Sequence, residues 1–126
     1  MSDDLHLDTN VVVLALGGDR RLSALIQGKY PVVSEIVEME LRCYPVANEE
    51  EEERIREFLA KARIRNLDGR IKDEAVRIRR AHKLKLLDAI VAASAKMDRR
   101  PLLTADGVFM KLRAEQGILY YHATLK

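Results

Sequence analysis

The sequence predicts an α/β fold, a three-layer sandwich with a mostly parallel central sheet. Short apolar segments alternate with helical segments along the whole chain, as in parallel strands joined by crossover helices. The length of 126 residues suits one domain, and hydrophobic residues make up 48% of it, enough for a buried core. Neither a repeat nor a Pro/Gly/Ser-rich linker divides the chain. We therefore expect one domain over residues 1–126.

Strand and helix signals alternate in the N-terminal half. We expect strands at 5–7 and 30–33, and helices at 10–16, 20–27, 35–43 and 49–62. Gly28 stops the second of these helices, and Ser34 is a candidate N-cap of the third. Asn48 followed by Glu51 resembles a capping box for the fourth.

The same alternation continues in the C-terminal half. We expect strands at 64–67, 102–104 and 118–121, and helices at 71–82, 84–97 and 106–115. The break at 98–101 contains Pro101 and separates a helix from the strand that follows it. Gly117 ends the last helix, and the final strand closes the sheet.

Composition excludes several classes of protein. The 22 Lys and Arg against 20 Asp and Glu give a net charge of only +2, so net charge alone does not indicate a nucleic-acid partner. The longest apolar run, 11–16, is far shorter than the roughly 20 residues that cross a bilayer, and the start is acidic rather than basic. We expect a cytoplasmic protein with no membrane association. With one cysteine, Cys43, and three histidines, any metal would be held by oxygen.

Acidic residues stand where the strands are expected to end. In open parallel sheets, ligands bind in the crevice at the carboxyl ends of the strands. Asp8 follows the first strand, and Asp106 follows the strand at 102–104. The strand at 30–33 leads into the helix that contains Glu40. We therefore expect these acids to meet at one edge of the sheet.

Two of the acids, Glu40 and a further one, Asp88, are expected to point into the apolar layer. The helical neighbours of Glu40 and of Asp88, three and four residues away, are mostly apolar. Burying an unpaired carboxylate costs several kcal/mol, so each needs protonation, a basic partner or a metal. If both converge with Asp8 and Asp106, a divalent cation would relieve the repulsion, and oxygen ligands favour Mg²⁺ or Mn²⁺.

Each acid also has a purely structural interpretation. Asp8 and Asp106 are typical of helix caps and first turns. Asp88 suits the helix dipole, and Glu40 could pair with a buried arginine. The run Glu49–Glu53 is interpreted as a solvated helix start, because consecutive residues face all around a helix. Convergence of the carboxylates decides between these interpretations and a metal site.

Four short motifs follow one another along nearly the whole chain. They are Leu7-Asp8-Thr9-Asn10, the segment from Ser34 to Leu41, the segment from Leu87 to Ser94, and Leu103-Thr104-Ala105-Asp106. In this order and at these separations they resemble the PIN-domain ribonucleases, most closely their small VapC-type toxin members. The resemblance implies a PIN-like fold and a single PIN-like nuclease domain.

The resemblance also implies roles for particular residues. The implied catalytic and metal-binding quartet is Asp8, Glu40, Asp88 and Asp106. The implied supporting residues are Thr9, Asn10 and Thr104. The implied activity is that of an endoribonuclease that uses Mg²⁺ or Mn²⁺ to hydrolyse RNA phosphodiester bonds, as the toxin of a toxin–antitoxin pair or as an RNA-processing nuclease. Relatives often carry a polar residue where Gly107 stands, so one metal and two both stay open.

The same resemblance implies partners. We expect a homodimer and a cognate antitoxin whose tail occupies the acidic crevice and inserts an arginine. The candidate RNA-binding residues are basic and lie near the expected crevice: Lys83, Lys85, Arg20 and Arg21.

Two alternatives stay open. One is a non-catalytic RNA-binding or protein-interaction module that keeps the PIN-like fold. The other is a phospho-accepting α/β domain, although Asp8 lacks the adjacent acid pair of receivers and Asn10 stands where phosphatases have an acid.

Overall fold

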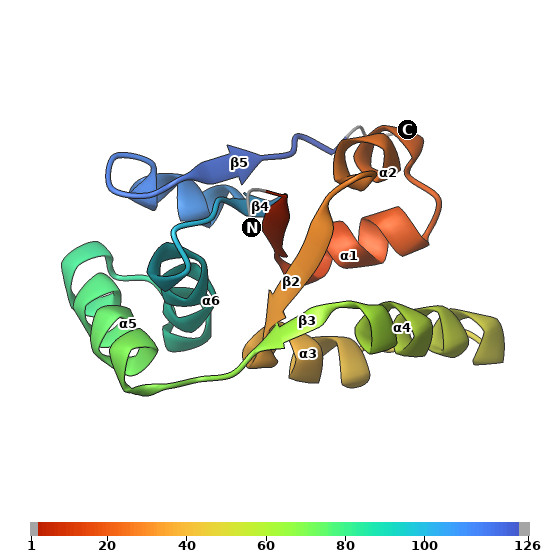
Figure 1. Cartoon of the computed structure of the whole chain (residues 1–126), viewed down its shortest axis with the longest axis horizontal. Coiled ribbons are helices and arrows are strands. Elements are labelled where there is room, and N and C mark those ends of the chain that lie inside the picture. The colour runs from red at the N-terminus through yellow and green to blue at the C-terminus, as the bar shows by residue number, and fades with distance from the viewer. Residues whose placement is uncertain (1–2, 124–126) are drawn as a thin grey trace.

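The computed structural model describes residues 3–123 and contains a five-stranded parallel sheet flanked by helices (Figure 1). The strands are β1 (Asp4–Leu7), β2 (Tyr30–Ser34), β3 (Arg63–Arg65), β4 (Leu102–Thr104) and β5 (Ile118–Tyr120). They lie in the order β3-β2-β1-β4-β5, and every neighbouring pair is parallel. The predicted α/β architecture is confirmed, while the two ends of the expected domain 1–126 fall outside the described residues.

Six α-helices within the described residues connect these strands. They are α1 (Thr9–Leu16), α2 (Arg20–Ile26), α3 (Glu35–Arg42), α4 (Glu49–Lys61), α5 (Gly69–His82) and α6 (Leu86–Met97). The expected strands and helices are found within a few residues of their predicted bounds, apart from the last helix. None of the helices that the structure describes is long and apolar enough to cross a membrane.

Side-chain caps fix where the helices begin. The Ser34 hydroxyl accepts a hydrogen bond from the Val37 amide at 3.2 Å, so Ser34 is the N-cap of α3 as predicted. Asn48 caps α4 by accepting from the Glu51 amide at 3.0 Å. The Glu51 carboxylate accepts from the Ala47 amide at 2.8 Å rather than from the cap residue itself. The predicted capping box is therefore only half formed.

The prediction of a helix at 106–115 is wrong. The structure has a short 3₁₀-helix there, η1 (Gly107–Leu112). Its buried residues Phe109 and Leu112 stand three apart, the spacing at which side chains line up on a 3₁₀-helix. Asp106 accepts from the Val108 amide at 3.0 Å, which favours this tight turn at the start of the segment.

Small and branched residues bring α6 close to the sheet and α5 close to α6. Four alanines of α6 are buried: Ala89, Ala92, Ala93 and Ala95. Val32 and Leu102 from the central strands, and Ile71 and Ile78 from α5, are fully buried as well. A parallel sheet has to be covered on its faces, and alanine lets a helix approach closely. This packing sets where the first turn of α6 lies relative to the strand ends.

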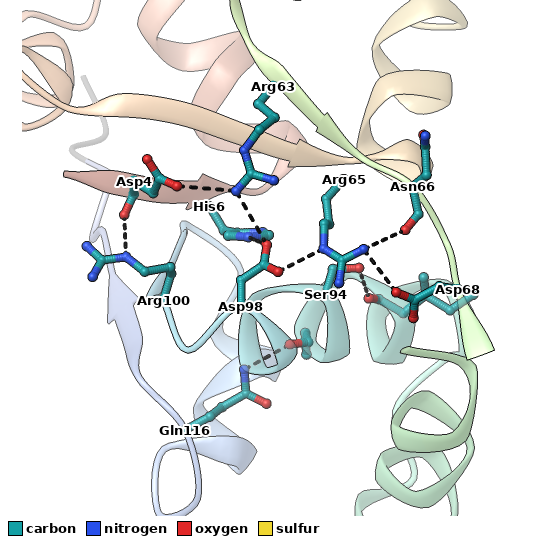
Figure 2. Close-up of polar contacts among 12 residues, drawn as sticks. Asp4, His6, Arg63, Arg65, Asn66, Asp68, Ser94, Asp98, Arg100 and Gln116 are labelled. Carbon is teal, nitrogen blue, oxygen red and sulfur yellow. Dashed lines mark hydrogen bonds and ion pairs between the residues drawn. The ribbon is translucent and has the colours of Figure 1, made fainter. Parts of the chain in front are cut away.

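A polar network joins the sheet to the end of α6 (Figure 2). The His6 Nε2 atom lies 2.7 Å from Asp98, which follows α6, and the Arg65 Nε atom donates to the same carboxylate at 2.8 Å. Burial lowers the pKa of His6, although Asp98 opposes this. Burial raises the pKa of Asp98, but the hydrogen bonds from Arg65 and His6 outweigh it and hold that pKa below its usual value. A neutral His6 therefore donates to an ionised Asp98.

Removing the central carboxylate is expected to destabilise the protein. An Asp98→Ala variant removes the acceptor of the buried His6 and of the Arg65 Nε–H, so the free energy of unfolding should fall by about 2–4 kcal/mol. Urea denaturation at pH 7 measures it. The control is Glu52→Ala, which removes an exposed ion pair to Arg56 and should change stability by about 0.5 kcal/mol or less. Equal losses in the two variants would contradict the importance of the network.

Candidate active site

A cleft of about 670 Å³ opens at the carboxyl end of the sheet. Strands β1 and β4 are neighbours and parallel, so the residues that follow them, Asp8 and Asp106, lie at the same edge. The cleft is lined by the four predicted acids: Asp8, Glu40, Asp88 and Asp106. The fold thus brings together carboxylates from both halves of the chain.

Asp8 is the buried acid of this cleft, with an exposed fraction of 8%. The Thr104 hydroxyl donates to one carboxylate oxygen at 2.8 Å, and the Thr9 amide donates to the other at 2.9 Å. The same Thr104 oxygen accepts from the Asp106 amide at 3.0 Å. One buried threonine therefore connects the first acid of the cleft to the backbone of the last.

The pKa of Asp8 is raised to about 6. Burial is the largest cause, and the hydrogen bonds from Thr104 and Thr9 only partly oppose it. The negative charges of Glu40 and Asp88 raise it further. The protein therefore holds a partly buried negative charge here that its own hydrogen bonds do not fully compensate.

Asp88 projects from the first turn of α6 and is half-buried. Burial raises the pKa of Asp88, and the negative charges of Asp106 and Glu40 raise it further, while the positive charge of Lys85 opposes them. Glu40 thus acts electrostatically on both Asp8 and Asp88, and Asp88 is also affected by Asp106. The expected position of Asp88 inside the packed layer is only partly correct, since this acid lies at the boundary between core and cleft.

The expected burial of Glu40 is wrong, because this residue is exposed on the cleft wall. Its carboxylate accepts a hydrogen bond from the Thr9 hydroxyl at 2.5 Å. The helical periodicity misled here because, of the apolar neighbours of Glu40, only Ile36 and Val37 are buried. Cys43 and Tyr44, taken as apolar neighbours of Glu40, are instead exposed and line the cleft. Asp106 is exposed as well.

The predicted supporting residues lie around these acids. Besides Thr9 and Thr104, the side-chain oxygen of Asn10 accepts from the Ala105 amide at 3.1 Å. This bond ties the first turn of α1 to the turn that carries Asp106. All three supporting side chains therefore hold backbone or carboxylate groups of the cleft in place.

The predicted basic residues do not all reach the cleft. Lys85 precedes α6 and acts electrostatically on Asp88. Lys83 ends α5 in a left-handed conformation with φ of 59° and does not line the cleft. Arg20 and Arg21 line a neighbouring cavity instead. Sequence reasoning gave no role to Tyr44 and its neighbours, and the only signal for them was the helix end before Pro45.

The donor set fits a hard divalent cation in its chemistry. The cleft offers carboxylate, hydroxyl and amide oxygens, which are the ligands of Mg²⁺ and Mn²⁺. Within residues 3–123, no ion pair to a lysine, arginine or histidine is found for any of the four acids. Over the same range, no group of three or more His, Cys, Asp or Glu side chains stands ready to hold a metal ion. Glu40 and Asp106 are exposed, so their side chains can change rotamer on binding.

Comparisons with known proteins agree with this fold. The family model described as "PIN domain" matches residues 5–115. No curated protein matches the sequence. A chain of a toxin–antitoxin complex from Klebsiella pneumoniae is 26% identical, with a TM-score of 0.78 over 91% of this chain and 95% of that one.

Two more distant structures share the fold. A chain of VapBC2 from Rickettsia felis, bound to a DNA fragment from its promoter, is 18% identical with a TM-score of 0.76 over 94% of this chain and 98% of that one. A chain of VapBC-5 from Mycobacterium tuberculosis is 21% identical with a TM-score of 0.74 over 94% and 99%. The expected PIN-like architecture is confirmed.

Removing the charge of Asp8 is expected to stabilise the metal-free protein. A pKa of about 6 lies above the usual value near 3.9, so ionised Asp8 destabilises the folded state at pH 7, and the penalty disappears as the pH falls below about 4. In EDTA, Asp8→Asn should raise the free energy of unfolding by about 1–3 kcal/mol at pH 7, with a smaller gain at pH 4. The control Asp73→Asn, on the exposed surface of α5, should change it by about 0.5 kcal/mol or less. A loss of stability in Asp8→Asn at pH 7 would contradict the electrostatic interpretation.

Proposed function

The chain belongs to the PIN domain family, and from that premise we propose that it is a divalent-metal-dependent endoribonuclease that hydrolyses RNA phosphodiester bonds. One observation carries the proposal: four carboxylates from both halves of the chain line one cleft, and burial and mutual repulsion raise the pKa of two of them. We propose Mg²⁺ or Mn²⁺ as the cation. The residues that would hold it are Asp8, Glu40, Asp88 and Asp106.

A divalent cation bound beside a phosphate lowers the pKa of a water molecule and stabilises the charge that develops on the phosphate and the leaving oxygen. The protein's own residues prepare the site. The bonds from Thr104 and Thr9 fix the orientation of the Asp8 carboxylate. The Thr9 hydroxyl also holds Glu40, so both acids are oriented from the start of α1.

Basic residues are needed as well, because an acidic cleft repels an RNA strand. Lys85 acts on Asp88 and stands where it can attract a phosphate group. We propose that Lys83, Arg20 and Arg21 contribute to the same attraction from outside the cleft. The nuclease would act on RNA in the cytoplasm.

We further propose that the chain is the toxin of a toxin–antitoxin pair. The similar chain from Klebsiella pneumoniae comes from such a complex, and the match extends over 95% of that chain. An antitoxin tail would place an arginine among the four carboxylates, where a charge-assisted hydrogen bond can form. A second cavity, of about 320 Å³ and mostly apolar, shares Val13 and Tyr44 with the cleft and offers room for apolar side chains of the same tail.

We also propose that the chain forms a homodimer.

The alternative is a PIN-like module that binds RNA or protein without turnover. One observation favours this alternative: among residues 3–123, no three His, Cys, Asp or Glu side chains are already close enough together to hold a metal ion. The two functions differ in a single respect, metal-dependent cleavage.

Cleavage of RNA should require both the cation and the cleft. The purified chain should degrade single-stranded RNA with Mn²⁺ or Mg²⁺ and stop in EDTA. Asp8→Asn should lower the rate by about 100-fold or more, equivalent to about 3 kcal/mol of activation free energy. The control Asp73→Asn should retain the wild-type rate. Equal rates in Asp8→Asn and wild type, or equal rates with and without EDTA, would exclude the proposed activity, and RNA binding without any cleavage would favour the non-catalytic module.

The toxin role has a test of its own in living cells. Induction of the wild-type chain in bacteria without an antitoxin should arrest growth and deplete an RNA species, because cleavage of cellular RNA stops protein synthesis. Asp88→Asn should be harmless at the same protein level, measured by immunoblot. Normal growth during expression of the wild-type chain, together with cleavage in vitro, would favour a processing nuclease. Equal toxicity of the wild type and Asp88→Asn would show that growth arrest does not depend on nuclease activity.

A further inference from the structure

A cavity of about 790 Å³ borders the acidic cleft along α1. The cavity and the cleft share Val13 and Leu14 in their walls. The polar side chains that line the cavity are Asp19, Arg20, Arg21 and Tyr121, and we call it the arginine pocket. A long ligand that lies in the acidic cleft can therefore continue over Val13 and Leu14 into the arginine pocket.

The guanidinium of Arg21 is held in a defined position. Its central carbon lies 5.2 Å from the centroid of the Tyr121 ring, within the range of a cation–π contact. One of its nitrogens donates to the His122 carbonyl oxygen at 3.2 Å. The side chain is exposed, and its planar guanidinium carries five N–H donors. Arg21 therefore presents an oriented positive charge at the pocket.

Tyr121 is in turn fixed by Asp19. The Tyr121 hydroxyl lies 2.8 Å from both carboxylate oxygens of Asp19, and Asp19 also accepts from the Leu22 amide at 3.0 Å. Tyr121 itself is 6% exposed, so its ring supports the arginine rather than offering a face to a ligand. The segment after β5 lies beside α2 (Figure 1), which is how residues from opposite ends of the chain build one pocket.

The charges of the two cavities complement each other. The acidic cleft contributes four carboxylates, whereas the arginine pocket contributes two guanidinium groups and one carboxylate that is already bonded to Tyr121. A polyanion such as RNA needs cationic contacts on either side of an acidic catalytic cleft. Arginine binds phosphate well because its planar donors match two phosphate oxygens at once.

We infer that an RNA strand leaving the acidic cleft passes over Val13 and Leu14 into the arginine pocket, where Arg21, assisted by Arg20, binds a backbone phosphate. Asp19 and Tyr121 are positioning residues for that arginine. The inference rests on the proposed nuclease function and assigns the side of the cleft on which the substrate extends.

Binding of RNA to a chain that cannot cleave it tests this inference. All variants carry Asp8→Asn, and the affinity for a fluorescent 12-nucleotide single-stranded RNA is measured by anisotropy over a range of salt concentrations. Arg21→Gln should weaken binding about tenfold and reduce the slope of log affinity against log salt by about 0.7, the value for one lost phosphate contact with a single strand. Arg21→Lys should keep the salt slope and recover part of the affinity, because it keeps the charge but loses the planar donors.

Two controls separate this role from general effects. Arg70→Gln removes the same charge from the start of α5, which lies at the far end of the molecule from α2 (Figure 1), and should leave binding within about twofold of the parent. Tyr121→Phe keeps the ring but loses the bond to Asp19. It should weaken binding about threefold with an unchanged salt slope, since the charge is still present but less well oriented.

The outcomes distinguish the inference from the proposed function. Equal affinities and salt slopes for Arg21→Gln and Arg70→Gln would overturn the inference, while RNA cleavage by the wild-type chain would leave the nuclease function intact. Failure of the parent to bind any RNA, together with no cleavage by the wild type, would overturn both. If Arg21→Gln leaves RNA binding unchanged but weakens binding of polyglutamate, the pocket receives an acidic protein segment and the inference is wrong.

Discussion

Repulsion between carboxylates at one edge of a parallel sheet is the interaction around which this protein is organised. Strands β1 and β4 are neighbours and point the same way, so the acids that follow them, Asp8 and Asp106, line the same cleft. Helices α3 and α6 add one acid each. Two unit charges about 4 Å apart repel by about 4 kcal/mol at an effective dielectric near 20. Burial is the main cause of the raised pKa values of Asp8 and Asp88, and this repulsion raises them further.

Hydrogen bonds and ion pairs outside the cleft offset the energetic cost of this repulsion. Helix α6 carries Asp88 in its first turn, and Asp98, which follows its last turn, bonds to the sheet through His6 and Arg65. A second ionic cluster joins α6 and α5 to the segment after η1. There Glu115 accepts from Lys96 at 3.1 Å, and although burial opposes it, bonds from His82, Lys96 and Arg77 lower the pKa of Glu115 to about 2. Bonds from Lys96 and Asp98 thus tie the C-terminal end of α6 to the sheet, to α5 and to the segment after η1.

Much of this could be predicted from the sequence, because its determinants are local. Apolar runs ended by an acid marked the strand ends at Asp8 and Asp106, and Ser34 marked the start of α3. The errors arose where tertiary contacts decide. Glu40 is exposed because Cys43 and Tyr44, which follow it, line the cleft instead of joining the core. The segment after Asp106 forms a 3₁₀-helix that buries Phe109 and Leu112. The pairing of Asp19 with Tyr121 could not be predicted, since nothing local links a loop near one end of the chain to a strand end near the other.

We propose that the four carboxylates of the cleft share a divalent cation. Anomalous scattering from crystals of the wild-type chain grown with Mn²⁺, collected near the manganese absorption edge, tests it most directly. A shared cation should give a peak in the cleft within about 2.0–2.4 Å of oxygens from Asp8 and at least one other of the four acids. A cleft without such a peak at saturating Mn²⁺, with its acids protonated or paired to basic side chains, would contradict it.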